Sequence, residues 1–166
     1  MGKRNCIPSA EYLHEILEYK NGKLYWKKII AKCIKIGNEA GTNNGKNYLI
    51  IPINYKHYYA HRIIYMMHHN YVPYIVDHID GNKFNNKIEN LRPANCNQNA
   101  ANQKLPKNNT STEKNVFWSK SKEKWQVSIS VKNKLKHIGT FLNFDDAKKA
   151  AYDARIKYHG EYANHG

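Results

Sequence analysis

Hydrophobic residues near the start of the chain recur at helical spacing. Leu13, Ile16 and Leu17 would share one face of a short amphipathic helix that Ser9 caps. The pair Asn21-Gly22 is typical of a turn and would end this helix. The next segment, KLYWKKI, predicts a strand, and GNEAGTNNGKN predicts a loop.

The middle of the chain alternates apolar and polar residues in a way that predicts a β-hairpin. The segments YLIIPI and HYYAH would pair around Asn54-Tyr55-Lys56, and Pro52 places the first strand at an edge or a bulge. The segment HRIIYMMHH then favours a helix. Farther on, YIVDHI predicts a short strand and GNKFNNKIEN a polar loop. Asn95 would cap a helix that includes Gln98 and Asn99.

The last third of the chain predicts a second, smaller domain. Residues 104–115 have no periodicity and are rich in Pro, Asn, Ser and Thr, which indicates a linker at 106–113. Three β-rich runs follow, NVFWSK, KWQVSISV and KLKHIGTF, and then alanines at helical spacing from Ala147 to Ala154. We therefore expect an α+β protein with one domain at 1–105 and, at 114–164, a three-stranded antiparallel sheet packed on one helix.

The charge of the chain favours nucleic acid as its partner. The 166 residues carry a formal net charge of +14, and basic residues outnumber acidic ones both before residue 110 (16 to 7) and after it (11 to 6). An acidic membrane surface is the weaker alternative. No apolar run predicts a membrane span or a signal peptide, so we expect an intracellular, cytoplasmic protein. The three cysteines are far apart and predict neither disulfides nor structural zinc.

Between Glu39 and Glu113 the chain has only three carboxylates, Asp77, Asp80 and Glu89, and two of them flank His78. Hydrolysis of a phosphodiester needs a base that takes a proton from water, for which histidine is suited. It also needs charge compensation, which a divalent cation on oxygen ligands supplies. On a strand, Asp77 and His78 would point to opposite faces, so they could meet one phosphate only at a twisted end or an irregular turn. Asp80 would shape the turn after His78.

The residues Asp77-His78, Asn90 and Asn99 resemble the HNH motif of phage and intron homing endonucleases. The spacings are 12 residues from 78 to 90 and 9 residues from 90 to 99, and AHRIIY, DHIDGN, ENLR and QN are similar as well. The resemblance covers residues 10–103, is most specific at 60–103, and implies a ββα-metal (His-Me finger) fold. It implies that His78 is the general base, that Asp77 and Asn99 bind one metal ion, and that Asn90 holds the loop that orients the base. Asn99 stands where the motif's name has its last histidine; an amide oxygen favours Mg²⁺ or Mn²⁺ over Zn²⁺.

Two arginines near this motif have alternative interpretations. Arg62 follows His61 in a pair that the HNH family often has, and it would contact a DNA phosphate or form a structural ion pair. Arg92 would contact a phosphate or cap the loop. Taken alone, His78 in an asparagine-rich loop is more often structural than catalytic. The ordered spacing, the strand–loop–helix order and the basic chain together favour the catalytic interpretation.

The segment 114–164 resembles the APETALA/ethylene-response-factor DNA-binding domain, in which the sheet enters the major groove. The similar words are VFW, KW, IGTF, AAYDA and KYHGEYA. Alternation puts Trp125, Val127, Ile129 and Val131 on the helix side of the second strand. The opposite face, with the neighbouring turn and strand, supplies the expected DNA-binding residues Lys120, Lys122, Lys124, Gln126, Ser128, Ser130 and His137. Plant members of the family have several Arg on this face, where this chain has Lys, Gln and Ser. We therefore expect weaker or different recognition of the DNA sequence.

The combined expectation is a site-specific, homing-type DNA endonuclease that uses Mg²⁺ or Mn²⁺ and acts on double-stranded DNA. We expect a monomer on DNA that nicks one strand, in a bacterial host cell if a phage encodes it. Two alternatives stay open. One is a DNA-binding regulator that does not cleave, and the other is a nonspecific HNH nuclease. An RNA target has less support, because no exposed aromatic stacking motif of the usual kind is present.

Overall fold

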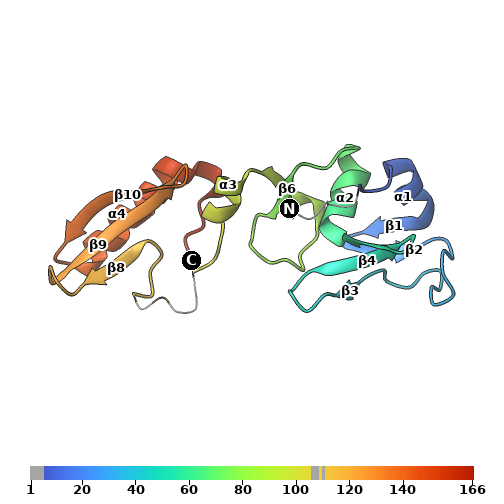
Figure 1. Cartoon of the computed structure of the whole chain (residues 1–166), viewed down its shortest axis with the longest axis horizontal. Coiled ribbons are helices and arrows are strands. Elements are labelled where there is room, and N and C mark those ends of the chain that lie inside the picture. Colours follow the sequence, from blue (N-terminus) through green and yellow to red (C-terminus); the bar gives the residue numbers. More distant parts are fainter. Residues whose placement is uncertain (1–5, 106–108, 110) are drawn as a thin grey trace. The chain divides into compact units, whose positions relative to one another are not determined.

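A computed structural model describes residues 6–105, 109 and 111–166 of the chain (Figure 1). Contacts between Cα atoms divide it into two compact units, unit 1 ending at Ala94 and unit 2 beginning at Asn95. Both units combine helices with antiparallel strands, which confirms the predicted α+β class. The expected domain boundary was residue 105, whereas the contacts group 95–105 with the C-terminal unit. Part of the expected linker, 106–108 and 110, lies outside the described residues.

Unit 1 begins with helix α1 (Ala10–Ile16), whose N-cap is Ser9; the Ser9 hydroxyl accepts a hydrogen bond from the Tyr12 amide at 3.4 Å. The expectation that this helix continues to Asn21 was wrong. Residues Leu17–Lys20 form strand β1, which pairs with β2 (Lys23–Trp26). Asn21 and Gly22 have φ of 48° and 86°, the left-handed pair that a two-residue hairpin turn needs. Pairing with β2 therefore overrides the helical spacing.

The predicted hairpin in the middle of the chain is confirmed. Strand β4 (Leu49–Ile53) pairs with β5 (Lys56–Tyr59) around Asn54 and Tyr55, and it also pairs with the two-residue β3 (Thr42–Asn43). Pro52 lies in the middle strand of this sheet, but β3 pairs only with Leu49 and Ile50. The missing N–H of Pro52 thus falls beyond the end of β3. Helix α2 (Ala60–His69) follows and ends at Asn70, which is in the left-handed conformation.

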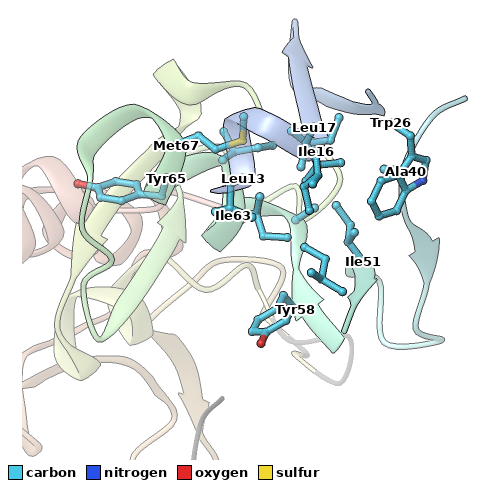
Figure 2. Close-up of a cluster of buried hydrophobic side chains, with 14 of the residues drawn as sticks. Leu13, Ile16, Leu17, Trp26, Ala40, Ile51, Tyr58, Ile63, Tyr65 and Met67 are labelled. Atoms are coloured by element: carbon cyan, nitrogen blue, oxygen red, sulfur yellow. The ribbon is translucent and has the colours of Figure 1, made fainter. Parts of the chain in front are cut away.

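The core of unit 1 is formed by side chains from α1, α2 and the strands between them (Figure 2). Leu13 and Ile16 of α1, Ile51 of β4, and Ile63 and Ile64 of α2 have no exposed surface. Burial of each such side chain contributes roughly 1.5–3 kcal/mol. The same core includes one residue from each strand of the hairpin that follows α2, Val76 and Leu91. That hairpin is therefore anchored in the main core of unit 1.

The hairpin consists of β6 (Ile75–His78) and β7 (Leu91–Ala94), joined by residues 79–90. Its register places Asp77 opposite Arg92 and His78 opposite Leu91, and a short 3₁₀ turn, η1 (Ile88–Asn90), leads into β7. The sequence predicted the strand and the loop but not β7. The chain next forms helix α3 (Cys96–Ala101) of unit 2, with a capping box between Asn95 and Gln98. This confirms Asn95 as the helix cap.

Unit 2 contains the predicted three-stranded antiparallel sheet, in the order β10–β9–β8, packed on helix α4 (Figure 1). The strands are β8 (Val116–Ser119), β9 (Lys124–Val131) and β10 (Lys134–Phe141). Helix α4 spans Phe144–His159 and is followed by the 3₁₀ turn η2 (Gly160–Tyr162). Val116 and Val127 of the sheet meet Ala147 and Ala151 of the helix in the core. The alanine spacing thus identified the buried face of α4.

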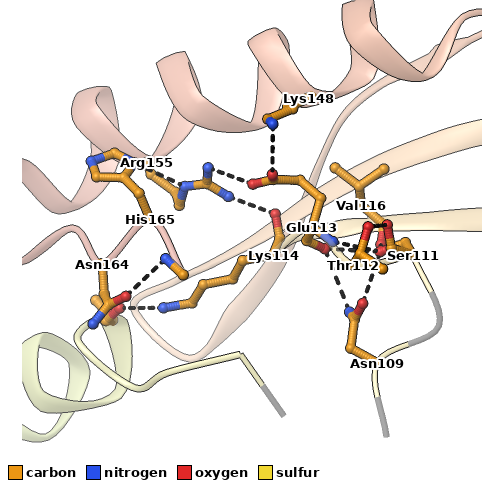
Figure 3. Close-up of polar contacts among 12 residues, drawn as sticks. Asn109, Ser111, Thr112, Glu113, Lys114, Val116, Lys148, Arg155, Asn164 and His165 are labelled. Atoms are coloured by element: carbon orange, nitrogen blue, oxygen red, sulfur yellow. Dashed lines mark hydrogen bonds and ion pairs between the residues drawn. The ribbon is translucent and has the colours of Figure 1, made fainter. Parts of the chain in front are cut away.

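A polar cluster joins α4 to the segment before β8 (Figure 3). Arg155 is 2% exposed and donates to the Glu113 carboxylate at 2.8 Å and to the Lys114 carbonyl at 2.6 Å. The Lys114 ammonium in turn donates to the carbonyls of Ala101 and Gln103, at the end of α3. The last carbonyl groups of a helix have no partner within the helix. At the end of α3 the Lys114 ammonium supplies that partner and so links α3 to the rest of unit 2.

Candidate active site

The loop between β6 and β7 is closed at its base by the side chain of Asn90. The Asn90 carboxamide accepts from the Asp80 amide at 3.0 Å and donates to Asp80 Oδ1 at 2.9 Å and to the Asn85 carbonyl at 2.8 Å. The Asn90 carbonyl also accepts from the Ile79 amide at 2.9 Å. One asparagine therefore connects the first, middle and last parts of the loop. The loop-holding role that the HNH resemblance implies for Asn90 stays a prediction, and these are the contacts through which it would act.

Asp80 is the acidic partner inside this loop. Its carboxylate accepts from the Asn82 amide at 2.8 Å and from the Asn85 side chain at 2.7 Å, in addition to Asn90. Partial burial works to raise the pKa of Asp80, but the hydrogen bonds from Asn85, Asn82 and Asn90 outweigh it and leave the pKa below its usual value. Asp80 is therefore ionised at neutral pH and shapes the turn, as the sequence suggested.

His78 lies at the end of β6, where the chain enters the loop, and only 5% of it is exposed. Its Nε2 is 3.0 Å from Oδ1 of Asn86, which is itself 2% exposed. Burial lowers the pKa of His78, against the opposing effects of the Asn86 hydrogen bond and of the Asp80 and Asp77 carboxylates. The imidazole is thus neutral at neutral pH, and the neutral ring is the form that can accept a proton.

Asp77 precedes His78 on β6 and is 6% exposed. Arg92, directly opposite on β7, donates from Nε to Asp77 Oδ2 at 3.0 Å. The expectation for Arg92 left open a phosphate contact or a loop cap, and the described contact is this ion pair with Asp77. A buried carboxylate needs such a partner, because an unpaired charge inside a protein is costly. Arg92 thereby balances the charge of the Asp77 carboxylate beside His78.

Arg62, the other arginine expected at DNA, holds the segment before β6. Its Nη1 donates to the carbonyls of Pro73 and Tyr74 at 3.1 and 3.2 Å. This contact fixes the connection between α2 and β6, and so the start of the strand that carries His78. A DNA contact of Arg62 stays a prediction.

An aromatic group that the sequence did not single out surrounds His78. His61 of α2 is 7% exposed, and its ring centroid is 5.0 Å from that of His78. Tyr48 and Tyr59 each lie 5.5 Å from His61, and Tyr48 is 6.4 Å from His78. The Lys83 ammonium, from the loop, is 4.4 Å from the centre of the Tyr48 ring. In the sequence the His61-Arg62 pair drew attention to Arg62, but the buried residue beside His78 is His61.

Asn99, the second expected metal ligand, lies on α3 in unit 2 and is partly buried. Its amide donates to the Asn95 carbonyl at 2.9 Å in the first turn of the helix. Among the described residues, no three His, Cys, Asp or Glu side chains come together in a way that could hold a metal ion. The pairing of Asn99 with Asp77 in a metal site stays a prediction.

The sheet face expected to bind DNA is largely open in unit 2. Register places Ser128 opposite His137, and Gln126 opposite Thr140, so these side chains share one face with Lys124 and Ser130. Lys124 and Ser130 are exposed, whereas Ser128 is 9% exposed. His137 Nε2 lies 3.3 Å from the Thr140 hydroxyl. The exposed residues Lys120 and Lys122 lie in the turn between β8 and β9.

Comparison with known proteins identifies the N-terminal motif. Residues 58–101 match the model of the HNH endonuclease family. The chain is also 37% identical over 90 residues to Protein 3.8 of Escherichia phage T7, an alignment that covers 54% of this chain and 74% of the phage protein. No solved structure matches the chain.

The chain thus belongs to the HNH endonucleases, a class of phosphodiester hydrolases that act on DNA and generally use a divalent metal ion. It is a distant homologue of the phage T7 protein. Within the described ranges, no helix is long and apolar enough to cross a membrane.

The low pKa of the buried His61 predicts that the protein loses stability in acid. Burial, followed by the neighbouring His78 and Arg62, lowers the pKa of His61 from its usual value of 6.5 to about 3. In the unfolded chain His61 becomes protonated near pH 6.5, whereas in the folded chain it becomes protonated only near pH 3. Between these two pH values His61 therefore lowers the free energy of unfolding progressively as the pH falls. The slope is about 1.4 kcal/mol per pH unit.

Urea unfolding of wild type and of His61→Phe at pH 7, 5.5 and 4.5 measures this effect. We expect the variant to lose less stability than wild type between pH 7 and 4.5. His57→Phe, at an exposed histidine of β5, is the matched control and should follow wild type. Equal acid sensitivity of wild type and His61→Phe would show that His61 does not stay neutral in the folded protein.

Proposed function

We propose that this chain is a metal-dependent, site-specific DNA endonuclease of the homing type that nicks double-stranded DNA. The observation that carries the proposal is the geometry of His78, a buried imidazole 3.0 Å from the Asn86 side chain at the start of a loop that Asn90 and Asp80 close.

The proposed step is hydrolysis of one phosphodiester bond. His78 takes a proton from a water molecule, the water oxygen forms a bond to phosphorus, and the bond from phosphorus to the leaving oxygen breaks. The leaving oxygen takes a proton from solvent, and His78 later returns its proton to solvent. The products are one phosphate end and one hydroxyl end, with no change of oxidation state.

The residues proposed to hold the metal ion are Asp77 and Asn99. Both offer oxygen ligands, which suit Mg²⁺ or Mn²⁺, and two protein ligands leave the other positions to water and a phosphate oxygen. The buried Asp77 carboxylate, with its charge balanced by Arg92 at 3.0 Å, fits this donor set. Bound there, the metal ion would compensate the charge that develops on the phosphate and the leaving oxygen. Arg92 would then orient the Asp77 carboxylate.

The proposed target reader is the open face of the sheet in unit 2, with Lys120, Lys122, Lys124, Gln126, Ser130 and His137. Lysines at its edge would contact phosphates, and the amide, hydroxyl and imidazole groups would contact base edges. Ser128 has the smallest share in this proposed contact, because it is only 9% exposed. One site per chain favours a monomer that nicks one strand inside the host cell.

The direct test is cleavage of a supercoiled plasmid that carries DNA from the gene's own neighbourhood. We expect wild type with Mg²⁺ or Mn²⁺ to give the open-circle form. Activity should fall by at least roughly 100-fold in His78→Ala, since general-base catalysis typically contributes 10²–10⁴-fold. Chelation should abolish it. His57→Ala, which removes an exposed histidine of β5, should cleave like wild type.

Three other outcomes would change the proposal. Binding of this DNA without cleavage under any metal would favour the DNA-binding regulator. Equal cleavage of plasmids with and without the neighbourhood sequence would favour the nonspecific nuclease. Linear product from the start would contradict nicking by a monomer and require two chains or two binding events.

The sheet-face proposal predicts a separate effect on binding. Replacing Lys120, Lys122 and Lys124 with Gln should weaken DNA binding and reduce the slope of log affinity against log salt, by about one unit for each phosphate that the variant no longer neutralises. Fluorescence anisotropy with a labelled duplex at several salt concentrations measures both quantities.

The matched control makes the same charge change on α4, which covers the other face of the sheet, with Lys148→Gln, Lys149→Gln and Lys157→Gln. This control should leave the slope close to that of wild type. If the helix variant bound DNA more weakly than the sheet variant, the proposed reading face would be wrong.

A further inference from the structure

Asn86 is the buried asparagine of a loop rich in exposed polar residues. Its exposed fraction is 2%, although neighbouring residues on both sides of it in the loop are exposed or half-buried. Closure of the loop does not use its side chain, since that task falls to Asn90 and Asp80. A buried carboxamide is costly without hydrogen-bond partners. The partners of Asn86 therefore indicate what it does.

The two ends of the Asn86 carboxamide meet different partners. Oδ1 lies 3.0 Å from Nε2 of His78, and Nδ2 lies 3.4 Å from the carbonyl oxygen of Phe84. A carbonyl oxygen only accepts and an amide nitrogen only donates, so the Phe84 contact sets which way the carboxamide points. The reverse orientation would place two acceptor oxygens against each other. The oxygen of Asn86 thus faces the imidazole.

The orientation of the carboxamide determines the tautomer of His78. Because Oδ1 cannot donate, Nε2 must carry the proton of the neutral ring, and the basic lone pair then belongs to Nδ1. The opposite tautomer would place the lone pair of Nε2 against the lone pairs of Oδ1. In the buried environment of these two residues, such a contact would be strongly unfavourable.

The backbone around Asn86 is held from outside the loop. Gly22, in the turn between β1 and β2, lies so close that a Cβ there would be 2.9 Å from the Lys87 amide nitrogen and 3.2 Å from the Asn86 carbonyl carbon. The hydroxyl of Tyr19 on β1 accepts from the Ile88 amide at 3.0 Å. The hairpin β1–β2 therefore supports the segment that presents Asn86 to His78.

We propose that Asn86 is a positioning residue that keeps His78 in the Nε2–H tautomer and aims Nδ1 at the attacking water. This inference rests on the proposed role of His78 as general base. In the reaction, the water proton moves to Nδ1, and the positive charge on the ring is stabilised by the hydrogen bond from Nε2–H to the Asn86 oxygen.

The test reads the tautomer directly in the full-length, metal-free chain labelled with ¹⁵N-histidine, at pH 8. Long-range proton–nitrogen correlation spectra distinguish a protonated from an unprotonated ring nitrogen. We expect wild-type His78 to show a protonated Nε2 and an unprotonated Nδ1. Asn86→Leu, which keeps the size and removes the acceptor, should show averaged signals of both tautomers. Asn86→Asp keeps an acceptor oxygen towards Nε2 but loses the Nδ2 donor to the Phe84 carbonyl, so Nε2 should stay protonated even where the loop shifts.

Cleavage kinetics of the same variants give the second measurement. Asn86→Leu should lower kcat by at least about tenfold with KM nearly unchanged, since only the alignment of the base is disturbed. Asn86→Asp should have a higher kcat than Asn86→Leu but a lower one than wild type, because it keeps the acceptor for Nε2–H and loses the donor to Phe84. Asn38→Leu, at an exposed asparagine of unit 1, should behave like wild type in both measurements.

The outcomes separate this inference from the nuclease proposal. A wild-type His78 protonated on Nδ1, or an Asn86→Leu variant with wild-type tautomer and kcat, would overturn the role of Asn86. If Asn86→Leu does not fold, the wild-type spectrum and Asn86→Asp still decide the question. If wild type has the expected tautomer but never cleaves DNA, the proposed nuclease function is wrong. Asn86 would then set the tautomer of His78 without a role in catalysis.

Discussion

The hydrogen bonds between Asn90 and Asp80 are the constraint on which the rest of the site depends. Residues 79–90 are polar and largely exposed, so apolar burial contributes little to their order. Order in the loop comes instead from three hydrogen bonds of the Asn90 carboxamide, which join the two ends of the loop to its middle. A charge-assisted bond to the Asp80 carboxylate is worth more than a neutral one, roughly 1.5–3 kcal/mol. With this loop closed, Asn86 can reach His78.

Three carboxylates of this basic chain, Asp77, Asp80 and Glu113, have structural partners. Asp80 is bound by asparagines of the loop, and Asp77 is paired with Arg92 across the ladder. Glu113 pairs with the buried Arg155 in unit 2. A net charge of +14 attracts DNA over a long range, but it also requires that negative groups be retained where the fold or the chemistry needs them. Scarcity of acidic residues was therefore a useful signal in the sequence.

The sequence predicted the elements whose period is clear and missed those set by distant contacts. The hairpin β4–β5, helix α2 and the three-stranded sheet followed from alternation and helical spacing. Leu17 had the right spacing for a helix, yet its backbone pairs with Trp26 across the hairpin β1–β2. The support residues Asn86 and His61 could not be predicted, because one asparagine among several in a loop, or a histidine beside an arginine, carries no signal of burial. Arg62 and Arg92 look like DNA contacts in sequence, and only the fold gives their carbonyl and carboxylate partners.

We propose that the closed loop, and not the mere presence of His78, makes the site competent for cleavage. Asn90→Asp tests it most directly, because the variant replaces the Nδ2 donor with an oxygen that faces the Asp80 carboxylate and so opens the loop by repulsion. Single-turnover cleavage of a saturating DNA duplex, combined with hydrogen exchange of residues 79–90, measures chemistry and loop closure together, with Asn38→Asp as the control of equal charge. We expect fast exchange in the loop and a cleavage rate at least about 100-fold below wild type, although His78 is intact. Fast exchange with a wild-type cleavage rate would contradict it.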